Sequence, residues 1–182
     1  EDTLSNIENI KGTDEADQLT GSAADNIILG EAGDDVIAGL DGADTIDGGS
    51  GIDEIDYSAD AAAGGDSGVT VDLSSGTATD GFGAEDTLSN IENIKGTDED
   101  DTITGNSGPN ILSGLGGSDK IYGGSGADNI VAGAGDDYIV GGHGSDIIDG
   151  GEGVDEVDYS TDQSLGGDTG ITIDLSSGTA ID

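Results

Sequence analysis

Aliphatic residues recur every nine positions along two stretches of the chain. The first stretch carries Leu19, Ile28, Ile37, Ile46 and Ile55, and the second carries Ile103, Leu112, Ile121, Ile130, Ile139, Ile148 and Val157. Each stands in the middle of a three-residue segment in which alternation along a strand turns its side chain inward. The pattern therefore predicts twelve short β-strands with aliphatic side chains on one face.

The residues between these strands follow the same period. An aspartate or asparagine lies two positions before each aliphatic, and a glycine lies seven positions before it in every repeat but one. The unit is G-G-x-G-x-D-x-U-x, where U is aliphatic, and twelve such nonapeptides cover 108 of the 182 residues. Glycines permit tight turns at positive φ. We expect strand and turn to alternate, and successive coils to pair as parallel strands about 4.8 Å apart.

A longer repeat is superimposed on the short one. Residues 1–15 recur unchanged at 85–99, an offset of 84, and VDLSSGTA at 71–78 returns as IDLSSGTA at 173–180, an offset of 102. The second unit is thus longer than the first, and the difference of 18 between the two offsets equals two nonapeptides. This indicates that two nonapeptides form one coil.

The predicted fold is all-β: a parallel β-roll, or right-handed β-solenoid with two nonapeptides per coil, in which two rolls are joined by a β-rich spacer. The segments are an entry strand at 1–11, a first roll of five nonapeptides at 12–57, a spacer at 58–95, a second roll of seven nonapeptides at 96–159, and the start of another spacer at 160–182.

The spacer is expected to lead the chain back into the next roll. Residues 69–73 alternate apolar and polar as in a strand, whereas 58–68 is expected to be an exposed loop. Ile94 lies nine residues before Ile103, in register with the inward positions. Tyr57 and its counterpart Tyr159 are expected to pack over the last coil of each roll.

The best matches to the unit are residues 48–53, 123–128, 141–146 and 150–155, each reading G-G-x-G-x-D. In this pattern the chain resembles the repeats-in-toxin (RTX) family, whose calcium-binding nonapeptides form β-rolls. The departures gather near the start of each block: Glu15, Ala24 and Glu99 at the fourth position, Asn26 and Asn110 at the sixth, and in addition Ala132 at the first position of a later repeat. The first two turns of each block are therefore doubtful calcium loops.

Turns of this composition offer hard oxygen ligands, which calcium prefers, and the chain has no cysteine and one histidine, which disfavours softer metals. The resemblance implies that each calcium lies between two loops that are separated by one full coil. The implied side-chain ligands are Asp17, Asn26, Asp35, Asp44, Asp53, Asp101, Asn110, Asp119, Asp128, Asp137, Asp146 and Asp155. The implied backbone carbonyls are those of Gly33, Gly42, Gly49, Gly51, Gly117, Gly124, Gly126, Gly133, Gly135, Gly142, Gly144, Gly151 and Gly153. Pairing these loops gives about eight calcium sites, of which the two with an asparagine should be the weakest.

The charge balance agrees with a need for cations. There are 41 acidic residues and 3 lysines or arginines, for a net charge of −38. Nucleic acid is excluded as a partner because its binding requires basic patches, and no apolar run is long enough for membrane insertion. Eight calcium ions would bring 16 positive charges and leave −22. We expect the calcium-free chain to be disordered and the calcium form folded; an acidic disordered tail is the alternative without calcium.

No catalytic residue is predicted. Carboxylates that recur every nine residues favour a structural role, and His143 is expected to be an exposed loop residue. The predicted function is a calcium-binding structural module of a large secreted or cell-surface bacterial protein, such as an adhesin, an extracellular filament or matrix, or a surface layer. The alternative is a C-terminal secretion and folding domain of a secreted RTX enzyme: a metalloprotease, lipase or epimerase. The resemblance implies type I secretion and an extracellular location.

Further copies of the chain are a predicted partner, through lateral or end-to-end assembly. The chain begins and ends at equivalent points of the long repeat, which favours a tandem array. Outward positions in the second roll could form an apolar patch for lateral association; these are Tyr122, Tyr138 and Val140 on one face and Ile111, Val131 and Ile147 on the other.

Overall fold

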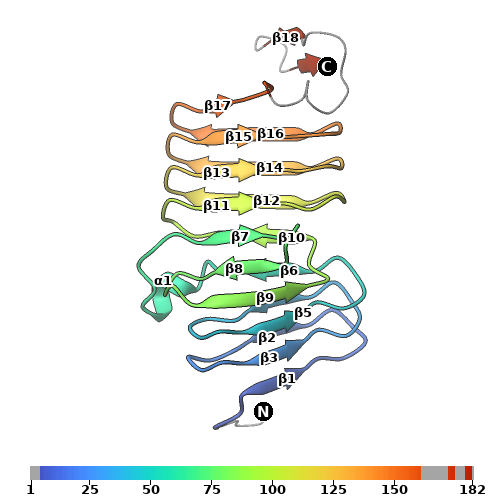
Figure 1. Cartoon of the computed structure of the whole chain (residues 1–182), viewed down its shortest axis with the longest axis vertical. Coiled ribbons are helices and arrows are strands. Elements are labelled where there is room, and N and C mark those ends of the chain that lie inside the picture. Colours follow the sequence, from blue (N-terminus) through green and yellow to red (C-terminus); the bar gives the residue numbers. More distant parts are fainter. Residues whose placement is uncertain (1–4, 161–171, 175–178, 182) are drawn as a thin grey trace.

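The computed structural model describes residues 5–160, 172–174 and 179–181. Over the first of these ranges the chain winds into a parallel β-solenoid, with strands stacked rung upon rung from the N-terminal to the C-terminal end (Figure 1). Partners on neighbouring rungs lie two nonapeptides apart within each block, as for Ile28 and Ile46 or Ile121 and Ile139. The predicted all-β solenoid, with two nonapeptides in each coil, is confirmed.

Two sheets form the walls of the solenoid. The ten-stranded sheet contains, in spatial order, β1 (Asn9–Lys11), β3 (Ile27–Leu29), β5 (Thr45–Asp47), β9 (Glu85–Ser89), β8 (Thr77–Thr79), β7 (Thr70–Asp72), β11 (Thr102–Thr104), β13 (Lys120–Tyr122), β15 (Tyr138–Val140) and β17 (Glu156–Val157). The seven-stranded sheet contains β2 (Gln18–Thr20), β4 (Val36–Ala38), β6 (Glu54–Asp56), β10 (Asn93–Lys95), β12 (Ile111–Gly116), β14 (Asn129–Ala134) and β16 (Ile147–Glu152). A separate hairpin pairs β18 (Thr172–Asp174) with β19 (Thr179–Ile181).

The core is a double row of aliphatic side chains between the sheets. At the aliphatic eighth position of the nonapeptides, and in β10, the residues that are at most 1 % exposed are Ile28, Ile37, Ile46, Ile55, Ile94, Ile103, Leu112, Ile121, Ile130 and Ile139. Burying each side chain contributes about 1.5–3 kcal/mol, so the period of nine builds a core without large aromatics. Tyr57 is fully buried in this core, in agreement with its predicted packing, whereas Tyr159 is partly exposed.

The spacer continues the sheets instead of separating the two rolls. β9 pairs in parallel with β5, and β10 pairs in parallel with β6, so that Leu88 and Ile94 extend the inward rows. β7 and β8 enter the ten-stranded sheet between β9 and β11 as antiparallel neighbours. The seven-stranded sheet receives no strands that match β7 and β8, so the two sheets differ in their number of strands. The strands of the first block lie tilted relative to those of the second (Figure 1).

Residues 58–68 differ in part from the exposed loop that we expected. They contain the helical turn α1 (Asp60–Ala63), which ends at Gly64 with φ of 114°. Ala61, Ala62 and Ala63 are exposed, but Asp60 is 1 % exposed because its carboxylate accepts a hydrogen bond from the backbone N–H of Gly81. Within the described ranges, no helix has the length and apolar character needed to cross a membrane.

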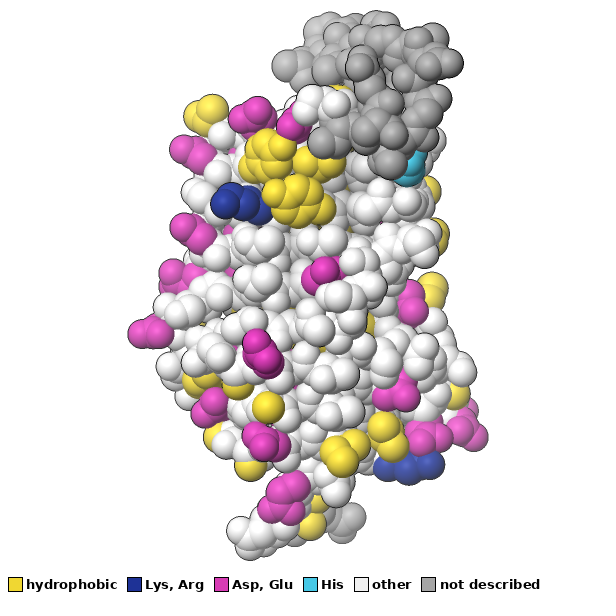
Figure 2. Space-filling view, viewed as in Figure 1, with side chains coloured by type: hydrophobic (Ala, Val, Ile, Leu, Met, Phe, Trp, Pro, Cys, Tyr) yellow, Lys and Arg dark blue, Asp and Glu magenta, His cyan; other side chains and the backbone are white. Residues whose placement is uncertain are grey.

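The outward residues of the second block lie on the two faces that the sequence predicted. Ile111, Val131 and Ile147 on the seven-stranded sheet are 47 %, 39 % and 69 % exposed. On the ten-stranded sheet the rings of Tyr122 and Tyr138 meet edge to face, with centroids 6.2 Å apart. Val140 is buried, contrary to expectation, and stands in register with Tyr122. Figure 2 shows acidic side chains spread over the visible face and a hydrophobic patch near its C-terminal end.

Candidate calcium sites

The sixth-position side chains form ladders along the edges of the solenoid. In each ladder a carboxylate Oδ1 accepts a hydrogen bond from the backbone N–H of the equivalent residue one coil earlier. The eight donor–acceptor pairs are Asp17–Asp35 (2.8 Å), Asn26–Asp44 (2.7 Å), Asp35–Asp53 (2.8 Å), Asp101–Asp119 (2.8 Å), Asn110–Asp128 (2.9 Å), Asp119–Asp137 (2.8 Å), Asp128–Asp146 (3.0 Å) and Asp137–Asp155 (3.2 Å). The structure thus brings together every pair of loops that the spacing predicted.

The second carboxylate oxygen, Oδ2, has no hydrogen-bond partner in several of these ladder residues. Oδ2 is buried without a hydrogen-bond partner in Asp35, Asp44, Asp53, Asp119, Asp128 and Asp137. Each of these residues is at most 2 % exposed. A buried anionic oxygen without a partner is costly unless a cation neutralises it. These six oxygens therefore fit ligands of a hard metal ion.

The turns supply further oxygen atoms. All thirteen predicted glycines have positive φ, from 90° at Gly142 to 150° at Gly51. A carbonyl of each loop is directed at a glycine in the equivalent loop of the next coil: a Cβ atom on Gly144 would collide with the oxygen of Gly126, and one on Gly51 with the oxygen of Gly33. The stacked loops consequently hold backbone oxygens of one coil against glycines of the next, in a space that a side chain would fill. Oxygen-only ligands of this kind suit calcium.

Three residues reach the turn conformation without being glycine. Glu31, Leu40 and Leu115 stand at the second position with φ of 79°, 69° and 76°. This backbone region costs an L-residue about 1–2 kcal/mol. With them, eight nonapeptides have positive φ at both the second and the fourth position. We call the turns of these nonapeptides the full loops. The sixth-position residues of the full loops are Asp35, Asp44, Asp53, Asp119, Asp128, Asp137, Asp146 and Asp155.

The first two loops of each block are closed differently, in keeping with their departures from the repeat. Their second-position N–H groups bind the sixth-position side chain of the same loop: Thr13 to Asp17 (2.6 Å), Ser22 to Asn26 (2.6 Å), Thr97 to Asp101 (2.7 Å) and Asn106 to Asn110 (2.9 Å). None of these second-position residues has positive φ. Here the side chain satisfies the turn directly, so these loops depend less on a cation.

Two ladder residues in the spacer were missed by the sequence reasoning. Oδ1 of Asp86 accepts the N–H of Asp44 (2.9 Å), and Oε2 of Glu92 accepts the N–H of Asp53 (2.9 Å). Asp86 and Glu92 take the places that the sixth-position residues of two further nonapeptides would have, because the first block has five nonapeptides and the second has seven. A signal was present, because Asp86-Thr87-Leu88 and Glu92-Asn93-Ile94 both read acid-x-aliphatic, as the nonapeptides do.

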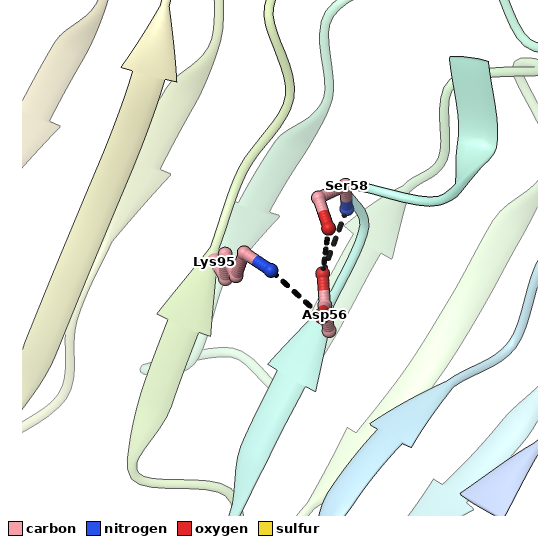
Figure 3. Close-up of polar contacts among 3 residues, drawn as sticks. All are labelled: Asp56, Ser58 and Lys95. Carbon is pink, nitrogen blue, oxygen red and sulfur yellow. Dashed lines mark hydrogen bonds and ion pairs between the residues drawn. The ribbon is translucent and has the colours of Figure 1, made fainter. Parts of the chain in front are cut away.

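Asp86 belongs to a buried acidic group where the spacer meets the first block. Its Oδ2 accepts the hydroxyl of Tyr57 (3.0 Å), and burial raises its pKa to about 7. The neighbouring carboxylates of Asp60 and Asp80 each keep one buried oxygen without a partner. The nearby lysine is engaged elsewhere: Lys95 pairs with Asp56 at 3.1 Å, and Asp56 also accepts bonds from Ser58 (Figure 3).

No three histidine, cysteine, aspartate or glutamate side chains converge as a metal cluster anywhere in the described part of the chain. In the ladders each carboxylate instead bonds to the backbone of the neighbouring coil. His143 is exposed, as expected, and takes part through its backbone, which donates to the oxygen of Gly124 (2.9 Å) and accepts from the N–H of Gly126 (2.8 Å).

Acid is expected to stabilise the calcium-free fold. Burial raises the pKa of Asp119 to about 7 and those of Asp44 and Asp128 to about 6, from an ordinary value of 3.8. The folded state therefore binds protons more tightly than the unfolded chain, and the resulting stability, complete below about pH 4, is lost as pH rises through 6 to 7. Calcium-free protein, prepared by dialysis, should therefore show a stronger β-sheet signal in far-ultraviolet circular dichroism at pH 5 than at pH 8.

Saturating calcium supplies the control for this pH dependence. Protons and calcium compete for the same carboxylates, so acid should lower the melting temperature of the calcium-loaded protein. Equal β-sheet signals at pH 5 and pH 8 in calcium-free buffer would contradict the burial of these groups.

Stacked glycine turns, ladders of paired carboxylates and buried oxygens without partners define a calcium-binding parallel β-solenoid. Comparison with known families finds the RTX calcium-binding nonapeptide repeat in four copies, at residues 3–37, 20–55, 95–130 and 122–157. These matches cover more than half of the 182 residues, and the chain belongs to this family, whose repeats bind calcium. No curated protein matches the sequence.

Proposed function

We propose that the chain is a tandem-repeat structural module of a large secreted or cell-surface bacterial protein, and that it folds when it meets calcium outside the cell. The observation that carries this proposal is the set of six buried Oδ2 atoms without partners in stacked loops. Extracellular calcium modules work at about 10⁻⁴–10⁻³ M calcium, far above intracellular levels, so such a fold is stable only after export.

The same oxygens support the assignment of ligands. We propose eight calcium sites, one for each pair of loops on neighbouring coils, held by the paired sixth-position side chains and by backbone carbonyls of the turns. Four of them lie between two full loops: Asp35/Asp53, Asp119/Asp137, Asp128/Asp146 and Asp137/Asp155. The other four contain Asp17, Asn26, Asp101 or Asn110, whose side chains already bind their own loop, and they are the weaker class.

A structural role is favoured over a catalytic one. The carboxylates repeat along the solenoid with one geometry, whereas an active site requires different groups around one reacting centre. The net charge of −38 opposes binding to nucleic acid or to anionic membranes. The second block repeats the first with one more coil, as expected for adhesins, filaments or surface layers whose length is set by repeat number.

Native mass spectrometry at increasing calcium concentration tests the site assignment. We expect four ions to bind first and up to eight at millimolar calcium, while magnesium, which requires regular octahedral geometry, does not replace them. Two ions or fewer at saturation would refute the assignment of the ladder residues. Sequence next to this unit tests the array: further copies of the long repeat support it, whereas a hydrolase or zinc-protease motif supports the secreted enzyme.

A further inference from the structure

Within the blocks, a carboxylate oxygen and a carbonyl oxygen meet above the first-position glycine of a loop. A Cβ atom on Gly30 would collide with Oδ2 of Asp35, from the same loop, and with the carbonyl oxygen of Gly48, from the next coil. Both oxygens therefore border one space between the two coils. The same combination of a sixth-position Oδ2 and a first-position carbonyl of the next coil lies nearest to Gly12, Gly96, Gly114 and Gly123.

The last loop of the first block has this arrangement too, although no nonapeptide follows it. A Cβ atom on Gly48 would collide with Oδ2 of Asp53, from the same loop, and with the carbonyl oxygen of Asn90, from the spacer. The N–H of Gly48 donates to the oxygen of Ser89 (3.0 Å), which is the bond that connects other first-position glycines to the next coil. Asn90 thus stands where the first-position residue of a further coil would stand.

Glu92 supplies the second carboxylate of this junction. Its Oε2 accepts the N–H of Asp53 (2.9 Å), the bond that a sixth-position aspartate makes elsewhere in the ladders. Two positions separate Asn90 from Glu92, whereas five separate the first and sixth positions of a nonapeptide. The spacer loop is therefore shorter, and the glutamate side chain, which is one methylene longer than that of aspartate, reaches the ladder.

The junction holds negative charge that the protein does not neutralise. Oδ1 of Asp53 accepts the N–H of the preceding coil, but its Oδ2 is buried without a hydrogen-bond partner, and the residue is 0 % exposed. Lys95, the one basic residue of the spacer, is paired with Asp56 instead (Figure 3). No ion pair of the described residues involves Asp53 or Glu92. A buried anionic oxygen in this state favours a bound cation.

We propose that Asp53, Glu92 and the carbonyl of Asn90 hold a ninth calcium ion, in addition to the eight of the loop pairs. This ion bridges the last coil of the first block and the segment that leads into β10, which pairs with β6 of the first block and β12 of the second. Two carboxylates and backbone oxygens form the site, and oxygen ligands of this kind suit calcium. The inference rests on the calcium-dependent fold proposed above.

The other ladder residue of the spacer lacks these features. Oδ1 of Asp86 accepts the N–H of Asp44, but Oδ2 of Asp86 already accepts the hydroxyl of Tyr57 (3.0 Å). The first-position glycine of that loop is Gly39, and the three atoms nearest to a Cβ there belong to Asp44 and Ile46, with no carbonyl oxygen among them. The proposal is therefore confined to the junction at Asp53.

Three substitutions separate the charge, the reach and the position of the glutamate. Glu92→Gln removes the charge but keeps an oxygen for the N–H of Asp53. Glu92→Asp keeps the charge but shortens the side chain. Glu8→Gln is the matched control, because residues 5–11 repeat residues 89–95 without change and Glu8 is exposed.

Native mass spectrometry and chemical unfolding at several calcium concentrations test the site. In about 1 mM calcium, the upper range for extracellular modules, both Glu92 variants should hold one ion fewer than the parent chain and Glu8→Gln. Their free energy of unfolding should also rise less steeply with the logarithm of calcium concentration, by one ion. Loss of a hydrogen bond alone would lower this free energy equally at every calcium concentration and would leave the slope unchanged.

Circular dichroism of the same samples separates the possible failures. A parent chain without calcium-induced β structure refutes the proposed function, and this site with it. A parent chain that folds with calcium, but has the same ion count and the same slope as both Glu92 variants, overturns the junction site alone. If the Glu92 variants do not fold, the parent chain decides: no more ions at saturation than its eight loop pairs overturns the site, and one more supports it.

Discussion

Removal of calcium is expected to unfold the protein. A chelator added to calcium-loaded protein at pH 8 should abolish the β-sheet signal in far-ultraviolet circular dichroism, and excess calcium should restore it. The reason is that the loops then hold six buried carboxylate oxygens without partners in a chain of net charge −38. Burial of the aliphatic rows and the hydrogen bonds of the ladders do not remove the repulsion between these negatively charged groups.

The size of the stabilisation by calcium follows from the thermodynamic linkage between calcium binding and folding. For sites with dissociation constants of about 10⁻⁴–10⁻³ M, about 10 mM calcium stabilises the fold by about 1.4–2.7 kcal/mol per site. Eight proposed sites together contribute about 11–22 kcal/mol, which is comparable to or larger than the roughly 5–15 kcal/mol that a typical domain has in total. The calcium-free chain should therefore be mostly unfolded at neutral pH.

Magnesium is the control for this experiment. At equal ionic strength it screens surface charge as calcium does, but it does not match the irregular oxygen-only loops. Full folding in magnesium or in sodium chloride would mean that screening alone is sufficient and that the ladder oxygens need no bound cation.

Asp137→Asn is expected to have opposite effects with and without calcium. Asp137 belongs to two proposed sites between full loops: its Oδ1 accepts the N–H of Asp119, and its own N–H donates to Asp155. Burial raises the pKa of Asp137, so its charge is unfavourable in the absence of a cation. Loss of two sites should lower the stability in about 10 mM calcium by about 3–5 kcal/mol, whereas calcium-free protein at pH 8 should become slightly more stable.

Asp136→Asn is the matched control. Asp136 is the preceding residue of the same loop, and it is exposed while Asp137 is 2 % exposed. Its substitution removes the same formal charge but none of the ladder oxygens. Chemical unfolding in calcium, and the β-sheet signal that remains in chelator, measure both variants. Equal effects of the two substitutions would show that total charge, and not the ladder geometry, controls stability.

The solenoid itself was predictable from the sequence because its information is local and repeated. A single inward aliphatic such as Ile121 determines one strand, its counterparts two nonapeptides away determine the register, and the glycines between them determine the turns. The pairing of Asp119 with Asp137 follows from this register alone. The exceptions in the first two loops were also visible, since Glu15 and Ala24 cannot adopt the turn conformation as readily as glycine.

The spacer could not be derived in the same way. Its strands do not follow the period of nine, and the sequence does not say that β7 and β8 enter one sheet while β10 follows β6 directly in the other. Asp60 was expected in an exposed loop, but contact with the distant Gly81 buries it. The positive φ of Leu40 and Leu115 was not expected either, because leucine rarely adopts this conformation.

The sequence by itself thus determined the repeat, the coil length, the inward row and the pairs of loops, since each depends on residues at a fixed spacing. Only the tertiary structure decided which carboxylate oxygen is left without a partner, which loops are closed by their own side chains, and how Asp86 and Glu92 complete the ladders. These features depend on how close certain segments lie in the folded chain, and the period of nine gives no spatial relation between those segments. Burial and hydrogen bonding there are properties of the assembled coils, not of any one repeat.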